Sequence, residues 1–245
     1  MSRKAKVPAD RPSVLPSVEV LAQMGIFLGL DEAALDEVLA AARTAAAQVG
    51  EAYVCQGEPA RSFYLLISGR VRLSQVTPEG QQVVMRFVSP GEEFGIVAVL
   101  GRLPYPVTAE AVEPALALAW SGEVFNGLIL RHPQIGLNGM AMLAERVKEF
   151  QDRLREAGTQ RVERRIANLL LRLARQAGRE VDEGVLIDLP LGRQDLAEMT
   201  GTTLFTVSRT LSAWEERGII GSARKHLTLR QPHALVAVAE DLPTS

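Results

Sequence analysis

RQDLAEMTGTTLFTVSRTLSAWEER, residues 193–217, is the stretch that decides how this chain is interpreted. Its pattern predicts two short helices that meet at Gly201, where the turn needs a backbone conformation that suits glycine. Apolar residues recur at helical spacing and predict the packing of the two helices against each other. They are Leu196, Ala197, Val207, Leu211 and Trp214. The layout is that of a helix-turn-helix, which places its second helix in the major groove of DNA.

The opposite face of the second predicted helix carries the side chains that would meet DNA. Arg209 lies there, with Phe205 one turn before it and Ser212 about one turn after it. A forked guanidinium can donate to guanine O6 and N7 together, so we expect Arg209 to contact a base. Thr202 or Thr203 begins this helix and can cap its amides or contact phosphate.

We expect further contacts from the starts of both helices and from a following hairpin. Thr203, Thr206 and Gln194 fit phosphate contacts, and GSARKHLTLR places Arg224 and Lys225 at a hairpin tip near the phosphate backbone. The candidate DNA-contacting residues are Arg193, Gln194, Thr203, Leu204, Phe205, Thr206, Ser208, Arg209, Ser212 and Lys225.

Composition favours two globular domains. The chain has 245 residues and 47% of them are hydrophobic, enough for two cores. No run reaches the roughly 18 uncharged apolar residues of a membrane span, and MSRKAKVPADRPS lacks the apolar centre of a signal peptide, so we expect a cytoplasmic protein. The single cysteine, Cys55, excludes an internal disulfide and any iron–sulfur or zinc site built from several cysteines of one chain.

The net charge of −2 hides an uneven distribution along the chain. Residues 160–231 carry 12 Lys and Arg against 9 Asp and Glu, whereas residues 1–159 carry 15 against 18. The basic excess therefore coincides with the predicted helix-turn-helix and supports DNA binding. Because the excess is small, an ordinary solvated surface is the alternative interpretation.

The N-terminal half predicts helices followed by a β-roll. After a disordered leader over residues 1–17, residues 18–46 predict short helices, with Asp31 as an N-cap. From about residue 48 to 121, apolar residues alternate, as at 63–67 and 83–87, and turn signals recur about every ten residues. This spacing is typical of a compact antiparallel sandwich.

A long helix is predicted from Pro133 to about residue 157. Its apolar residues follow a heptad seam, with charged residues on both flanks, which favours pairing of two copies along the seam. The alternative is that the seam packs on the β-roll of its own chain. The seam residues are Met140, Leu143, Val147, Phe150 and Leu154. Gly158 then precedes another predicted helix, residues 162–176.

A sandwich, a long helix and a helix-turn-helix in that order resemble the superfamily of the cyclic-AMP receptor protein and the fumarate-nitrate regulator (CRP/FNR). The resemblance rests on GEEFGIVAVLGRLPYPVTAEA at 91–111, VERRIANLLLRLARQ at 162–176 and LPLGRQDLAEMTGTTLFTVSRTLSAWEERGII at 189–220. It covers nearly the whole chain. It implies a homodimeric transcription regulator that binds a two-fold symmetric operator and has RNA polymerase as a further partner.

The expected fold class is α+β, in three parts. Residues 18–132 would form a cyclic-nucleotide-binding-like β-roll, or jelly roll, with flanking helices and a sensing role. Residues 133–158 would form the dimerisation helix, and residues 159–245 a winged helix-turn-helix.

The resemblance also argues against cyclic AMP as the effector. Members that bind it carry a glutamate soon after the glycine of the 91–97 region and an arginine near Tyr105, whereas this chain has Ile96 and Tyr105. A phenol cannot replace the positive charge of arginine. The alternative is that Arg102, which is close in sequence, binds the phosphate group in a different arrangement. Phe150 falls where a small hydroxyl residue would meet the adenine. The candidate effector-pocket residues are Gly95, Ile96, Tyr105, Thr108 and Phe150.

Other chemistries have weaker support. Haem sensing would need His132 or Cys55 as an axial ligand, but a solvent-facing or capping role suits His132, and a buried apolar role or a redox-active thiol suits Cys55. Metal-dependent enzymes on β-roll folds need clustered histidines, and residues 48–121 contain none, so we predict no catalytic or metal site. A ligand-binding protein without DNA binding would leave the helix-turn-helix unexplained.

Two questions stay open at this stage. The protein either responds to an effector between β-roll and long helix or binds DNA without one. Many relatives have an arginine and a glutamate where this chain has Leu204 and Phe205, which implies a different base preference, with contact to thymine methyl groups. The alternative for Phe205 is that it packs inward or against a neighbouring helix.

Overall fold

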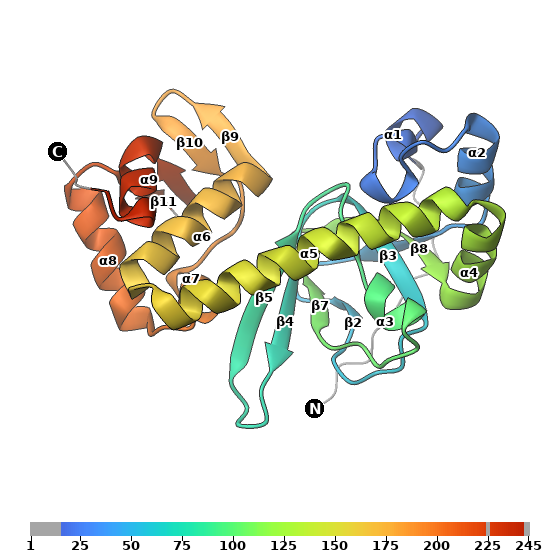
Figure 1. Ribbon diagram of the computed structural model, residues 1–245, viewed down its shortest axis with the longest axis horizontal. Helices are drawn as coiled ribbons and strands as arrows, with labels where there is room; N and C mark the ends of the chain where they lie inside the picture. The colour runs from blue at the N-terminus through green and yellow to red at the C-terminus, as the bar shows by residue number, and fades with distance from the viewer. Residues whose placement is uncertain (1–15, 224–225, 243–245) are drawn as a thin grey trace. The chain divides into compact units, whose positions relative to one another are not determined.

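The computed structural model describes residues 16–223 and 226–242. The chain forms two compact units, residues 1–148 and 149–245. The leader predicted for residues 1–17 lies almost entirely outside the described residues, as does Lys225. Each unit has its own sheets and helices (Figure 1).

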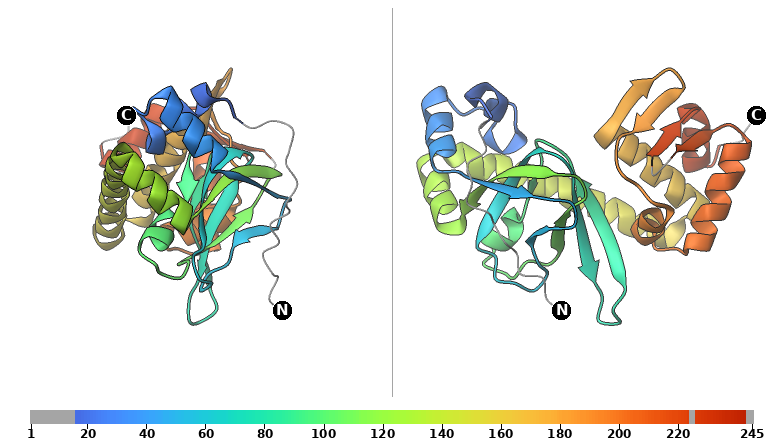
Figure 2. Two further views of the ribbon diagram at one scale, coloured as in Figure 1. Left: turned by 90° about the vertical axis from the view of Figure 1, so that its right-hand side faces the viewer. Right: turned by 180° about the vertical axis from the view of Figure 1, so that it is seen from behind.

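The first unit is a β-roll of two four-stranded antiparallel sheets (Figures 1 and 2). One sheet has the strand order β1-β8-β3-β6 and the other β2-β7-β4-β5. The strands are β1 Arg43–Ala47, β2 Ala52–Val54, β3 Ser62–Ser68, β4 Val71–Val76, β5 Gln82–Val88, β6 Glu93–Phe94, β7 Thr108–Ala111 and β8 Ala115–Ser121. The predicted β-roll is confirmed.

Helices cover one of these sheets. Figure 1 shows α1, α2 and α4 gathered at the same end of the β-roll. The predicted N-cap of α2 is confirmed, because Asp31 Oδ1 accepts a hydrogen bond from the backbone N–H of Ala34 at 2.8 Å. The helices are α1 Val18–Ala22, η1 Gly25–Phe27, α2 Glu32–Ala40, α3 Ile96–Leu100, α4 Gly122–Arg131 and the first part of α5, Pro133–Thr159.

Strand β3 is buried on both faces because the first unit has two hydrophobic cores. Tyr64 and Leu66 belong to the core between the two sheets. Phe63 and Leu65 belong to the core between one sheet and the helices. There the Phe63 ring stacks on Trp120, with 5.0 Å between ring centroids. A continuous apolar run is therefore required in β3, where an exposed sheet would show alternation.

The prediction of helical structure up to residue 46 is wrong at its end, because Arg43–Ala47 forms the strand β1. This strand pairs with β8 from Arg43↔Ala119 to Ala47↔Ala115. Ala45 and Ala47 are buried in the core between the sheets. Alanine favours helices in isolation, but here pairing with β8 and burial between the sheets override the local preference.

The strict alternation predicted over residues 83–87 is also wrong. The register between β4 and β5 shifts between Leu73 and Ser74, which leaves Met85 as the extra residue of a β-bulge. A bulge changes which residues face the core, so Val84 is buried before it and Phe87 after it.

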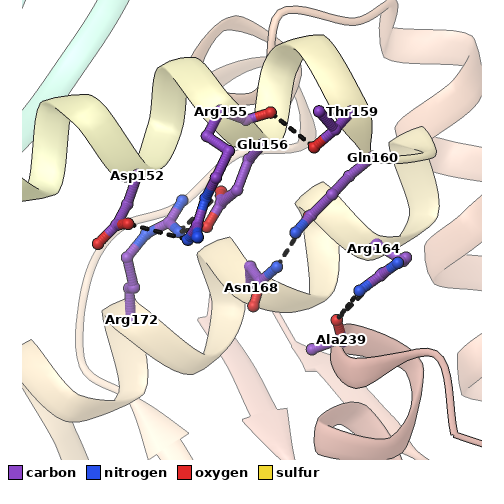
Figure 3. Close-up of polar contacts among 9 residues, drawn as sticks. All are labelled: Asp152, Arg155, Glu156, Thr159, Gln160, Arg164, Asn168, Arg172 and Ala239. Carbon is purple, nitrogen blue, oxygen red and sulfur yellow. Dashed lines mark hydrogen bonds and ion pairs between the residues drawn. The ribbon is translucent and has the colours of Figure 1, made fainter.

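The second unit holds the end of α5 and a small α/β domain. Its sheet has the order β11-β12-β10-β9. Arg164 of α6 donates twice to the carbonyl oxygen of Ala239 and so fastens α9 (Figure 3). The elements are α6 Val162–Ala177, β9 Gly178–Val181, β10 Gly184–Ile187, α7 Arg193–Thr200, α8 Leu204–Glu216, β11 Ile220–Ala223, β12 His226–Leu229 and α9 Pro232–Glu240. The hairpin β9–β10 and helix α9 are additions to the predicted winged helix-turn-helix.

Polar contacts tie the last turns of α5 to α6 (Figure 3). Arg172 Nη1 donates to both carboxylate oxygens of Glu156, at 2.8 and 2.9 Å. Asn168 Nδ2 donates to Gln160 Oε1 at 3.0 Å. Because Glu156 is only 8% exposed, water screens its ion pair weakly. These contacts hold the end of the long helix against α6.

Candidate nucleic-acid interface and sensor cavity

Helices α7 and α8 form the predicted helix-turn-helix. Gly201 ends α7 with a φ of +63°, a conformation that glycine adopts without strain. Thr203 caps α8, because its Oγ1 accepts a hydrogen bond from the N–H of Thr206 at 3.2 Å. The apolar residues predicted to pack the two helices, Leu196, Ala197, Val207, Leu211 and Trp214, are all buried.

The exposed face of α8 combines one cation with two apolar side chains. Phe205 is 73% exposed and Leu204 is 47% exposed, so the alternative that Phe205 packs inward is wrong. Arg209 is also exposed, and its Cζ lies 6.0 Å from the centre of the Phe205 ring. That distance is the outer limit of a cation–π contact. This face can therefore offer a guanidinium and apolar contacts to the same ligand.

Arg193 is positioned differently from Arg209, because it bridges the two helices. Its Nη2 lies 3.4 Å from the carboxylate of Glu215. Its Nη1 lies 3.5 Å from both the carbonyl oxygen of Ser208 and the hydroxyl of Ser212. Bonds of this length are weak, so Arg193 is held near the start of α7 without being locked.

Two further candidate contacts lie on the same domain. Gln194 is exposed at the start of α7 and donates from Nε2 to Glu198 at 3.0 Å. The predicted wing is present as the hairpin β11–β12. Arg224 and Lys225, predicted for its tip, lie outside the described residues.

The predicted seam of α5 is exposed along its whole length. Exposure ranges from 44% for Leu143 to 64% for Leu154. Met140, Val147 and Phe150 lie within that range, and Leu137, which the sequence analysis missed, is 54% exposed. Within the first unit, Met140, Leu143 and Val147 are therefore left accessible by the β-roll. An apolar stripe of this extent on a single chain is typical of an interaction surface.

Tyr105, near which the family resemblance leads us to expect an arginine in members that bind cyclic AMP, is bonded to the backbone of its own unit. Its hydroxyl donates to the carbonyl oxygen of Ser62 and accepts from the Ser62 N–H at 3.1 Å. Its ring packs so tightly on Gly95 that a Cβ there would lie 3.2 Å from it. Burial raises the pKa of the Tyr105 phenol, so it stays neutral. This position therefore offers no positive charge to a phosphate group.

A separate cavity of about 340 Å³ lies in the first unit between α3 and α5. Its walls are mainly apolar, and at one side Arg146 of α5 forms an ion pair with Glu93, which is only 2% exposed. Of the candidate effector-pocket residues, Ile96 lines this cavity, and Gly95, Tyr105 and Thr108 do not.

The remaining two candidate pocket residues have other positions. Thr108 of β7 accepts a hydrogen bond from the N–H of Gln56 at 3.1 Å. Phe150 belongs to the second unit. The five predicted pocket residues therefore stay a prediction, of which Gly95, Ile96, Tyr105 and Thr108 lie in the first unit.

The two candidate haem ligands are engaged elsewhere. His132 Nε2 lies 2.6 Å from a carboxylate oxygen of Glu37, whose other oxygen accepts from Arg131 at 2.6 Å, so this group joins α2 to α4. Cys55 is partly buried, and burial raises the pKa of its thiol, which disfavours a reactive thiolate. Neither side chain is presented as an axial ligand.

Within residues 16–223 and 226–242, no group of three or more His, Cys, Asp or Glu side chains could hold a metal ion. None of the helices in these ranges combines the length and apolar character that crossing a membrane requires.

Comparison with known proteins gives matches over most of the chain. The family profile "Cyclic nucleotide-binding domain" matches residues 46–132, and "Crp-like helix-turn-helix domain" matches residues 164–238. The cyclic AMP receptor protein of Thermus thermophilus is 30% identical over 214 residues, which are 87% of this chain and 96% of that protein. The global nitrogen regulator of Synechocystis is 28% identical over 73% of this chain and 80% of its own length.

The fold is also shared with solved structures. The structure of FixK2 from Bradyrhizobium japonicum aligns with a TM-score of 0.70 at 25% identity and covers 83% of this chain and 98% of that one. A cyclic-nucleotide-binding domain followed by a helix-turn-helix defines a class of transcription regulators. This chain belongs to the CRP/FNR superfamily of that class.

Proposed function

We propose that the protein is a homodimeric regulator that binds a palindromic DNA operator sequence-specifically and does so without cyclic AMP. The observation that carries the proposal is the exposed face of α8, where Arg209 and Phe205 project from a buried and well-capped helix-turn-helix. A helix presented in this way can enter the major groove.

The exposed stripe of α5 supports the homodimer. Two copies that pair along Met140, Leu143, Val147, Phe150 and Leu154 would cover the apolar side chains that a single chain leaves in water. Such a pair has two-fold symmetry, so its two α8 helices would contact equivalent half-sites. Half-sites about 10 base pairs apart, one turn of DNA, are the expected spacing.

Base contacts are assigned to the exposed end of α8. Arg209 would donate to a guanine, while Leu204 and Phe205 would contact thymine methyl groups. Phosphate contacts are assigned to residues around both helix starts and to the wing, and these fix orientation without specifying sequence. They are Arg193, Gln194, Thr203, Thr206, Ser208, Ser212 and Lys225.

The contacts of Tyr105 support independence from cyclic AMP. A buried neutral phenol, bonded to Ser62 and packed on Gly95, lies near the position where the resemblance implies a phosphate-binding cation. A second candidate function is gating by another effector, and the 340 Å³ cavity beside the Glu93–Arg146 pair favours it. Such an effector must bind two arrangements of the protein with different affinity. RNA polymerase is the further partner we propose, as the resemblance to CRP/FNR regulators implies.

The test is selection of binding sites from a random duplex library by the purified dimer, with and without cyclic AMP. We expect the same palindrome under both conditions. Arg209→Ala should lose the enrichment, whereas Arg217→Ala, which removes an exposed arginine at the other end of α8, should keep it. Weak, salt-sensitive binding without any enriched sequence would favour the effector-gated alternative. No binding even at low salt would contradict the proposal.

A further inference from the structure

A cleft of about 800 Å³ opens on the first unit and is separate from the cavity between α3 and α5. We call it the outer cleft. It is lined by residues 59–61 before β3, by residues 102–104 after α3, by Val99, and by the side of α4 that runs from Ser121 to Leu130. Its volume lies in the range of small-molecule sites, and DNA binding makes no use of it.

Backbone contacts hold the walls of the outer cleft together. Pro59 and Pro104 form an isolated antiparallel bridge between the two loops. The N–H of Gly122 donates to the carbonyl oxygen of Arg61 at 3.0 Å and joins the start of α4 to the first loop. The N–H of Tyr105 donates to the carbonyl oxygen of Glu58 at 2.9 Å. The cleft is therefore preformed, which lowers the entropic cost of binding a ligand.

Two arginines line the outer cleft with their charges available. Arg61 and Arg102 are both exposed, and within the described part of the chain neither has an ion-pair partner. Glu123 is the carboxylate of the lining, so the charged side chains of the cleft sum to one positive charge. Planar guanidiniums are suited to carboxylate and phosphate groups, which they can bind through two parallel hydrogen bonds.

The backbone of Arg102 is strained, and this is a second and independent observation. Its φ is +52°, in the left-handed region that favours glycine. It follows Gly101, the C-cap of α3, in a Schellman arrangement, in which the Leu103 N–H donates to Ala98 and the Arg102 N–H to Val99. The chain places arginine where glycine is usual. Strain of this kind is retained where the side chain has a role, and here the side chain lines a cleft.

Apolar side chains complete the lining. Leu130 is 83% exposed and Leu103 is 57% exposed, and both lie in the same cleft as the two arginines. We propose that the outer cleft binds a small molecule in which an anionic group, a carboxylate or a phosphate, is attached to an apolar body. Arg61 and Arg102 pair with the anionic group, and Leu103 and Leu130 contact the apolar body. This binding does not depend on the proposed operator recognition.

The first experiment is calorimetric titration of the full-length protein with three probes: 4-phenylbutyrate, phenyl phosphate and the neutral 4-phenylbutanamide. We expect at least one anionic probe to bind at least tenfold more tightly than the amide, because only the anions pair with the guanidiniums. The stronger of the two anions identifies the carboxylate or the phosphate as the natural group. Equal affinity for the amide, or no binding of either anion, would overturn the proposal.

Variants then locate the binding. Arg61→Gln and Arg102→Gly should each weaken the anion at least tenfold, and Arg43→Gln, which changes an exposed arginine of β1 outside the cleft, should leave it unchanged. Arg102→Gly should also keep or raise the thermal midpoint, since glycine relieves the left-handed backbone. Loss of binding in a variant at least as stable as the parent excludes misfolding as the cause. Unchanged affinity in both cleft variants would refute the site.

Discussion

Replacing Glu156 with glutamine should destabilise the second unit more than replacing Arg172 with methionine, although both changes remove the same ion pair. The reason is Arg153. Its pKa is lowered by burial and by the neighbouring charge of Arg172, and is raised by Glu149 and Glu156. Glu156 therefore compensates two partly buried guanidiniums. Without Arg172, Glu156 still has Arg153, whereas without Glu156 the two cations repel each other and only Glu149 remains to offset the charge of Arg153.

The size of the effect follows from how well the pair is shielded. Breaking a fully buried ion pair costs about 3–5 kcal/mol. The side chains of Arg172 and Glu156 are 24% and 11% exposed, so water screens part of the interaction. We expect losses of about 2 kcal/mol for Arg172→Met and about 3 kcal/mol for Glu156→Gln. With a urea dependence of about 2 kcal/mol per molar, the unfolding midpoints fall by about 1 M and 1.5 M.

The assay is urea unfolding followed by tryptophan fluorescence in a Trp120→Phe background, so that buried Trp214 reports on the second unit alone. Arg155→Met is the matched control, because the ion pair of Arg155 with Asp152 is 70% and 46% exposed and is expected to contribute less than about 0.5 kcal/mol. Equal losses for the two test variants, or a larger loss for Arg172→Met, would refute the assignment of two cations to one carboxylate.

Three further outcomes are expected. Phe150→Glu should convert the dimer to monomers in sedimentation experiments, because it places a charge in the apolar seam, while Leu130→Glu off the seam should leave a dimer. Arg209→Ala should bind operator and random DNA equally in a gel-shift titration, and retained preference for the operator would assign base recognition to another residue. Glu37→Gln should flatten the acid part of the stability profile. The hydrogen bond with His132 lowers the pKa of Glu37, so the stabilisation that ionised Glu37 provides is present above about pH 4.5 and is lost as the pH falls through that lowered pKa. If the thermal midpoints of the variant fell with acid as steeply as those of the parent protein, this role of Glu37 would be excluded.

Sequence patterns were sufficient to predict those structural features that are caused by residues close together in the chain. The turn at Gly201, the cap at Thr203 and the buried face of Val207 and Leu211 are set by residues within four positions of one another. Helical periodicity expresses such contacts directly, so the helix-turn-helix was predictable. The exposed seam of α5 was predictable for the same reason, and Leu137 was missed because it lies one turn before the heptad pattern begins.

Elements that depend on distant partners were not predictable in this way. The alanines of β1 have a high helix propensity and became a strand because β8 pairs with them. A β-bulge opposite Ser74 decides which residues of β5 face the core, and no pattern of neighbouring residues predicts that bulge. The hydrogen bonds of the Tyr105 hydroxyl could not be predicted either, because its partner Ser62 lies 43 positions away in the chain.

The sequence by itself therefore determined the family, the order of the domains, the α8 face that carries Arg209 and the apolar seam of α5. Only the tertiary structure decided which charged and polar groups are already engaged, as Arg193 is with Glu215 and Glu93 is with Arg146, and which line an open cleft, as Arg61 and Arg102 do. Periodicity records which side of an element is apolar. Whether a polar side chain has a partner depends on segments that are far apart in the chain and meet only after folding.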